Sequence, residues 1–118
     1  MRDHTQLKVF ELADQLALSI YRESGHFPSS ELYGLQSQVR RAAVSIAANI
    51  VEGCARNTEA EYLRFLDIAY GSALELQYEI SLCGRLKFLE EGSARRLHDE
   101  CTSIAKALNG LIRSIRGR

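Results

Sequence analysis

The sequence predicts an all-α protein, an antiparallel four-helix bundle with up-down-up-down connections. Apolar residues recur at helical spacing along most of the chain, and no stretch alternates with the period of two that a strand would show. The 118 residues include a single proline, Pro28, so long helices can run without interruption. Short segments rich in glycine or polar residues separate four long amphipathic stretches, which is typical of a bundle. We expect residues 1–118 to form one domain.

The first helix is expected from Leu7 to about Glu23. Its apolar face consists of Val9, Leu12, Ala13, Leu16 and Ile20 and is widened by Phe10, Ala17 and Tyr21. The segment after it should end the helix, because Gly25 can adopt a left-handed conformation and Pro28 cannot continue a helix. Ser29 or Ser30 can then cap the second helix.

The second and third helices are expected at residues 31–54 and at 58 to about 87. The second has a core stripe of Leu32, Leu35, Val39, Ala42, Ala43, Ile46 and Ile50. Thr58 and Glu61 have the spacing of a capping box at the start of the third. The core stripe of the third helix is Tyr62, Phe65, Ala69, Ala73, Leu76, Ile80 and Cys83.

The fourth helix is expected from Glu90 or Ser93 to Ile115. Its apolar residues are spaced alternately by four and three, which predicts a heptad seam of Leu97, Cys101, Ile104, Leu108, Leu111 and Ile115.

The two middle helices carry more apolar surface than one bundle core requires. The side opposite their core stripes contains Val44, Ala48, Val51, Leu63, Tyr70, Leu74 and Tyr78. A monomer rarely leaves a contiguous apolar patch in water, so we expect these residues, flanked by Arg40, Arg41 and Glu52, to form a homo-oligomer interface. Scattered surface hydrophobes with solvated charges are the alternative interpretation.

The chain lacks the patterns that carry catalysis or cofactor binding. There is no Glu-x-x-His pair for a di-iron bundle, no glycine-rich phosphate loop and no nucleophile elbow. Carboxylate pairs such as Glu75/Glu79 fall mostly on faces away from the core stripes, where charges are normally solvated. We therefore predict no catalytic residue, no metal ligand and no cofactor.

The cysteines and the apolar runs predict a location in the cytoplasm. Cys54, Cys83 and Cys101 are odd in number and far apart, so we interpret them as reduced, buried side chains. The longest nearly apolar run, residues 42–51, is too short to span a bilayer, and no membrane association is expected.

The charge distribution indicates one candidate surface for nucleic acid. The net charge is zero, from 15 basic and 15 acidic residues, which argues against a strongly electrostatic binder. Residues 93–118, however, have six basic and two acidic side chains, a net charge of +4. The basic residues are Arg95, Arg96, Lys106, Arg113, Arg116 and Arg118, and they could contact RNA or DNA phosphates. Arg113, Arg116 and Arg118 could instead complement the helix dipole.

Two long segments and a short one resemble a known family. YGLQSQVRRAAVSIAANIVEG at residues 33–53 and EYLRFLDIAYGSALEL at residues 61–76 are similar to the second and third helices of the bacterial four-helix bundle proteins encoded in 23S rRNA intervening sequences. LNGLI at residues 108–112 also fits, and the resemblance extends from Leu7 to Ile115. Ala47 departs from the family pattern, which often has proline there and with it a kink.

The resemblance implies a homopentameric barrel of bundles. Relatives include the accessory variability determinant of diversity-generating retroelements. For that relative, the resemblance implies binding to nucleic acid and to a reverse transcriptase. For the present chain we expect a non-enzymatic homo-oligomer that binds RNA or another nucleic acid. The alternatives are a structural or adaptor protein that binds another protein through its outer helix faces, and an enzyme with a site assembled between subunits.

Overall fold

The computed structural model describes residues 2–118 and shows four α-helices with no strand in that range. They are α1 (Lys8–Ser24), α2 (Leu35–Cys54), α3 (Glu59–Arg85) and α4 (Glu91–Arg116). Two single-turn 3-10 helices, η1 (His4–Gln6) and η2 (Ser29–Glu31), precede α1 and α2. The prediction of an all-α fold with four long helices is confirmed.

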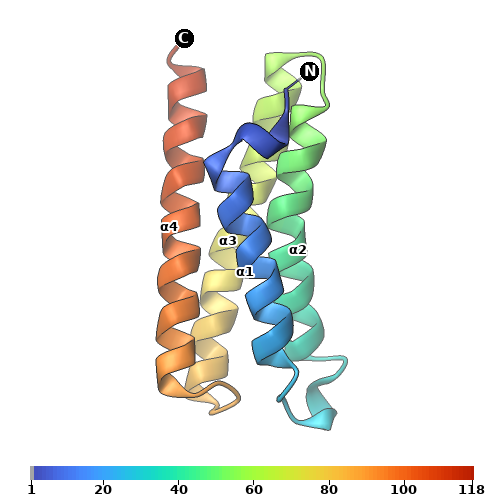
Figure 1. Cartoon of the computed structure of the whole chain (residues 1–118), viewed down its shortest axis with the longest axis vertical. Coiled ribbons are helices and arrows are strands. Elements are labelled where there is room, and N and C mark those ends of the chain that lie inside the picture. The colour runs from blue at the N-terminus through green and yellow to red at the C-terminus, as the bar shows by residue number, and fades with distance from the viewer. Residues whose placement is uncertain (1) are drawn as a thin grey trace.

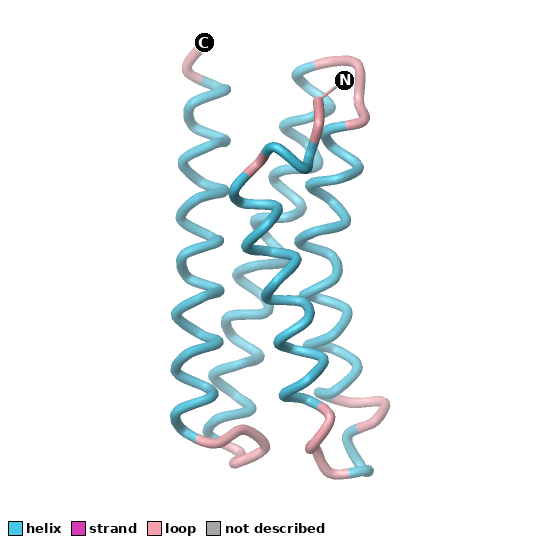
Figure 2. The backbone as a smooth tube through the Cα atoms, in the orientation of Figure 1, coloured by secondary structure: helices cyan, strands magenta, loops and turns pink. Residues whose placement is uncertain are grey.

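The helices lie side by side in a rod of 45 × 22 × 19 Å (Figure 1). The connections between α1 and α2 and between α3 and α4 lie at one end of this rod, and the turn between α2 and α3 lies at the other (Figure 2). Both termini lie at the end of the α2–α3 turn (Figure 1). Each helix therefore exposes one long side to solvent and presents another to its neighbours.

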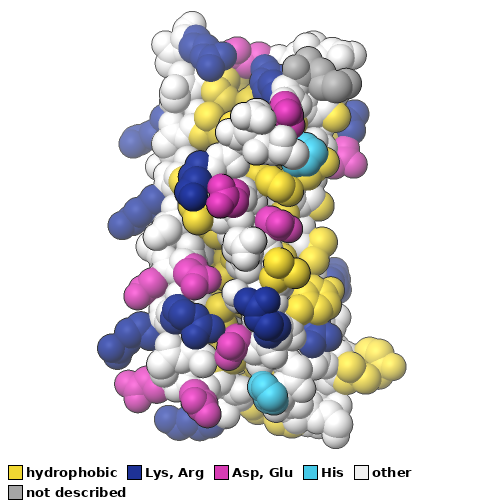
Figure 3. All heavy atoms as spheres, viewed as in Figure 1, with side chains coloured by type: hydrophobic (Ala, Val, Ile, Leu, Met, Phe, Trp, Pro, Cys, Tyr) yellow, Lys and Arg dark blue, Asp and Glu magenta, His cyan; other side chains and the backbone are white. Residues whose placement is uncertain are grey.

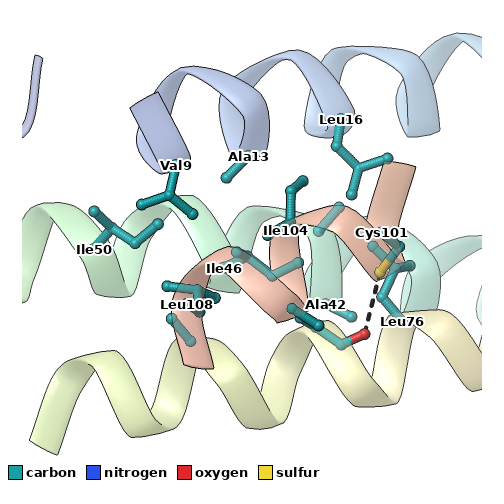
Figure 4. Packing of buried hydrophobic residues seen from close by; sticks show 14 of the residues in the cluster. Val9, Ala13, Leu16, Ala42, Ile46, Ile50, Leu76, Cys101, Ile104 and Leu108 are labelled. Carbon is teal, nitrogen blue, oxygen red and sulfur yellow. Dashed lines mark hydrogen bonds between the residues drawn. The ribbon is translucent and has the colours of Figure 1, made fainter. Parts of the chain in front are cut away.

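The core is a single apolar column to which all four helices contribute (Figure 4). Leu16 of α1, Ile46 of α2, Leu76 of α3 and Ile104 of α4 are all fully buried in it. Burying an aliphatic side chain of this size contributes about 1.5–3 kcal/mol relative to leaving it exposed. Helix association is therefore driven mainly by the stripes that helical periodicity predicts.

Two helix starts show how local chemistry sets the boundaries. Thr58 caps α3, because its side-chain oxygen accepts a hydrogen bond from Glu61 N at 3.2 Å, as the capping-box spacing predicts. The prediction that the second helix begins at Glu31 is wrong. Gly34 leaves the helical region with φ −107° and ψ −121°, and the Glu31 carboxylate accepts from Leu35 N at 3.0 Å. Leu32, expected in the core, is consequently half exposed in the loop.

The core register of two helices also differs from the prediction. Leu66 rather than Phe65 is fully buried on α3, because Leu66 continues the alternate spacing of four and three from Tyr62 to Cys83. On α4, Ile112 is buried while Leu111 lies at the edge of the core. A straight helix of 3.6 residues per turn drifts away from a seven-residue repeat, which explains the shift near the end of this long helix.

Candidate nucleic-acid interface and self-association surface

Three basic residues of α4 share one exposed face. Arg95, Lys106 and Arg113 are separated by eleven and seven residues, and at about 100° per residue this spacing places them within roughly 20° of one another. All three are exposed. Lysine and arginine side chains project from the edge of the molecule where α4 lies, with aspartate and glutamate side chains between them along its lower half (Figure 3). Arg95, Lys106 and Arg113, defined here as the α4 basic face, are the part of the predicted nucleic-acid surface that the helical spacing brings together.

The other three candidates are held by carboxylates of the same chain. Arg96 lies 3.2 Å from Glu23 of α1 and 3.8 Å from Glu100. Arg116 lies 2.6 Å from Asp67 of α3, and Arg118 lies 3.3 Å from Glu59. These ion pairs fasten α4 to α1 and α3, so their cations are partly neutralised.

The residues of the α4 basic face make fewer ion pairs than Arg96, Arg116 and Arg118. Within residues 2–118, Arg95 makes a single, long ion pair of 3.7 Å with Glu91 one turn earlier. Lys106 and Arg113 have no carboxylate within ion-pair distance in residues 2–118. Their charges are therefore available to a polyanion without breaking an internal contact.

Some residues of the predicted oligomer interface are exposed in the structure, and others are partly buried within their own chain. Val44, Leu74 and Tyr78 are exposed large apolar side chains, with 44%, 43% and 61% of their surface accessible. Arg41, Ala48 and Glu52 are also exposed, and Glu52 pairs with Arg56. Val51, Leu63 and Tyr70 are only partly exposed, and Leu63 and Tyr70 pack against the core of their own chain.

Arg40 has a role inside the chain that the helical pattern does not indicate. Its guanidinium donates to Ser24 Oγ at 2.8 Å and to the Tyr21 carbonyl at 3.2 Å, and it stacks over the Tyr21 ring. Arg40 therefore ties α2 to α1, although the sequence pattern groups it with interface residues.

A polar seam joins α2 to α3 beside the apolar core. The Ser45 and Ser72 hydroxyl oxygens are 2.8 Å apart, and Asn49 Nδ2 donates to the Ser45 carbonyl at 2.8 Å. Outside this contact lies a pocket of about 410 Å³, lined by Gln38, Arg41, Ala42, Ser45, Ser72 and Glu75.

Glu79 lies close to this seam. Helical periodicity does not identify it as a buried residue, because carboxylate pairs on helices are usually solvated. The structure shows instead that its side chain is buried, with 3% of its surface exposed. Burial and the neighbouring Glu75 carboxyl raise the pKa of Glu79 to about 8, and Arg41 opposes the shift. The signal in the sequence was its position next to Ile80 and one turn from Leu76, at the edge of the core stripe.

The thiols are buried and unpaired, as predicted. Cys54, Cys83 and Cys101 form no disulfide. Burial raises the pKa of Cys83 to about 11 and that of Cys101 to about 12. At neutral pH they are therefore protonated and poorly nucleophilic.

Residues 2–118 contain neither a candidate metal cluster nor a candidate membrane span. No cluster of three or more histidine, cysteine, aspartate or glutamate side chains there could hold a metal ion. None of the helices in the same range has the length and apolar character required to cross a membrane.

Comparison with known proteins adds a family and a fold. A family model described as 23S rRNA-intervening sequence protein matches residues 5–110. The fold is similar to a crystal structure of a protein of unknown function from the S23 ribosomal protein family of Bacteroides thetaiotaomicron. That similarity has a TM-score of 0.80 at 24% identity and covers 88% of this chain and 97% of the other. No curated protein matches the sequence.

Proposed function

The chain belongs to the family of 23S rRNA-intervening sequence proteins, and from that membership we propose that it is a non-enzymatic, self-associating bundle that binds RNA or another nucleic acid. The α4 basic face is the contact surface in this proposal. Self-association supplies several such faces in one particle, in the homopentameric form that the family resemblance implies.

The availability of Lys106 and Arg113 is the observation that carries the nucleic-acid part. Both are exposed and free of carboxylate partners in residues 2–118, on a face that extends from Arg95 over 18 residues. At about 1.5 Å per residue this face is roughly 27 Å long, enough to contact several phosphates of a duplex. Binding through phosphates depends on shape and charge and needs no base-reading side chain.

Exposed apolar side chains on the two middle helices support self-association. Val44, Leu74 and Tyr78 would lose unfavourable contact with water if a second copy covered them. Gly71 lies on α3 near Leu74, and a Cβ placed there would meet nothing within 4 Å. Glycine inside a helix costs about 1 kcal/mol relative to alanine, so a glycine without an internal packing reason fits close approach by another copy.

The test of nucleic-acid binding compares a short RNA hairpin and a DNA hairpin of the same sequence, titrated with protein at several salt concentrations. We expect affinity for at least one hairpin to fall as salt rises. In the double variant K106E/R113E, binding should weaken strongly, and the slope of log affinity against log salt should become shallower by about two.

A charge-matched control is the double variant K8E/R85E, which changes two exposed basic residues of α1 and α3. It makes the same change in net charge outside the α4 basic face, so it should bind nearly as well as the natural chain. Absence of binding to both hairpins at low salt contradicts the proposal, and equal weakening in the two double variants contradicts the assignment to α4.

A further inference from the structure

One side-chain oxygen at the junction of α2 and α3 stands out by its lack of a partner. Glu79 Oε1 is buried and has no hydrogen-bond partner in residues 2–118. A buried polar atom without a partner is costly, and a buried carboxylate without one is far more so. The side chain is therefore compatible with its burial when the carboxyl group carries a proton.

The surroundings of Glu79 explain how such a proton is kept. Glu75, one turn earlier on α3, is a second carboxyl group close enough to hydrogen-bond to Glu79, and two carboxylates this close do not both ionise readily. On α2, the charge of the Arg41 guanidinium favours the ionised carboxylate and lowers the pKa of Glu79. Further along α3, burial raises the pKa of the Cys83 thiol, and the charges of Glu79 and of Glu31 in η2 raise it further. In the described part of the chain, the charges that act on Glu79 come from α2 and α3.

We propose that the Glu75–Glu79 pair is a proton-controlled lock on the α2–α3 seam. With one proton on the pair, Glu79 stays buried beside the core and the two helices pack closely. When the proton leaves, two negative charges face each other, one of them without a compensating donor. The Glu79 side chain then moves outward toward Arg41 and the pocket of about 410 Å³ that Arg41 lines, and this end of the seam loosens.

The direction of the pH effect follows from linkage. The pKa of Glu79 in the folded protein is raised to about 8, above the ordinary value of 4.5 that the unfolded chain has. Between these values the folded state holds a proton that the unfolded state has released. The proton on Glu79 therefore contributes its full stabilisation below the ordinary pKa of 4.5. This contribution to the free energy of unfolding is lost as the pH rises through the folded-state pKa of about 8. Across the interval the unfolding equilibrium constant should increase by up to about tenfold per pH unit.

The experiment measures urea unfolding from pH 5 to pH 10 at one protein concentration for the natural chain, Glu79→Gln and Glu90→Gln. Glutamine imitates the protonated acid, so E79Q should lose the pH-dependent term. Glu90 is exposed and forms no ion pair in residues 2–118, so E90Q should follow the natural chain. Parallel profiles for the natural chain and E79Q overturn the proposal.

A direct titration keeps the test decisive if E79Q folds poorly. The carbon resonance of the Glu79 carboxyl group in the natural chain should titrate with a midpoint near 8, and a midpoint near 4.5 overturns the lock. Glu75→Gln should lower this midpoint without returning it to the ordinary value. Arg41→Met should raise it, because the released carboxylate loses its cation; an unchanged midpoint in R41M overturns the outward movement toward Arg41.

Discussion

Arg40 Nε on α2 donates a hydrogen bond to Ser24 Oγ at the end of α1, across a distance of 2.8 Å. The same guanidinium donates to the Tyr21 carbonyl, and Gln36 Nε2 donates to the Ser24 carbonyl at 2.8 Å. The last carbonyl groups of a helix have no partner within it. Two side chains of α2 therefore satisfy the end of α1 at the point where the chain reverses direction.

Replacing Arg40 by methionine should lower the free energy of unfolding by about 1–2 kcal/mol, because it removes the donors to Ser24 and Tyr21 while retaining an unbranched apolar chain. The neighbouring change Arg41→Met, at an exposed position, should cost less than about 0.5 kcal/mol at neutral pH. Urea unfolding measures both. A change in oligomer size for R40M with undiminished stability would restore Arg40 to the interface and contradict its role within the chain.

Leu74→Glu should dissociate the self-associated protein while the bundle stays helical, because a charge in an apolar interface is strongly disfavoured. Leu18→Glu is a matched control, since Leu18 on α1 is 49% exposed and Leu74 is 43% exposed. Sedimentation velocity gives the particle mass, and circular dichroism gives the helix content. If the natural chain sediments as a monomer at high concentration, or if both variants dissociate alike, the proposed surface is wrong.

Two glycines should respond to alanine in opposite ways. A Cβ at Gly53 would lie 3.0 Å from Phe65 Cβ and 3.2 Å from Tyr62 Cδ1, so Gly53→Ala should destabilise the bundle by about 1–2 kcal/mol. Gly71→Ala meets open space and should stabilise an isolated bundle by about 1 kcal/mol. Thermal unfolding in the Leu74→Glu background separates these effects from assembly. The same sign for both substitutions contradicts the packing described here.

Lys87→Gly should stabilise the turn between α3 and α4 by about 1 kcal/mol. Lys87 has φ 68°, a left-handed conformation that glycine adopts without the clash of a Cβ. Arg85→Gly, two residues earlier within α3, should instead cost about 1 kcal/mol. Differential scanning calorimetry of both variants measures the contrast, and a loss of stability in K87G would show that the lysine side chain itself holds the turn.

The fold class and most of the core were predictable because they depend on local periodicity. One error arises where a single contact overrides that pattern. Leu32 has the spacing of a core residue, but the Glu31 carboxylate binds Leu35 N and Gly34 leaves the helical region, so the helix starts later. At Phe65 the pattern itself decides, because the adjacent Leu66, and not Phe65, keeps the alternate spacing of four and three between Tyr62 and Cys83.

The candidate surfaces were less predictable because they depend on contacts between distant residues. The alignment of Lys106 with Arg113 follows from their spacing alone. By contrast, Arg116 and Asp67 are 49 residues apart in sequence. Glu79 likewise sits at the edge of a helical stripe, and its burial depends on how closely α2 covers that edge.

In the proposed complex with nucleic acid, the carboxylates that hold Arg116 and Arg118 make these two arginines weaker phosphate ligands than Arg113, which pairs with no carboxylate in residues 2–118. A polyanion that reaches Arg116 or Arg118 meets a cation already matched by Asp67 or Glu59, and it gains only by exchanging one oxyanion for another. Such an exchange has a small net driving force, so these two arginines contribute little to loose adsorption of bulk RNA. A nucleic acid of defined shape that is bound elsewhere along the bundle would still place its phosphates close enough to replace Asp67 and Glu59 as partners of Arg116 and Arg118.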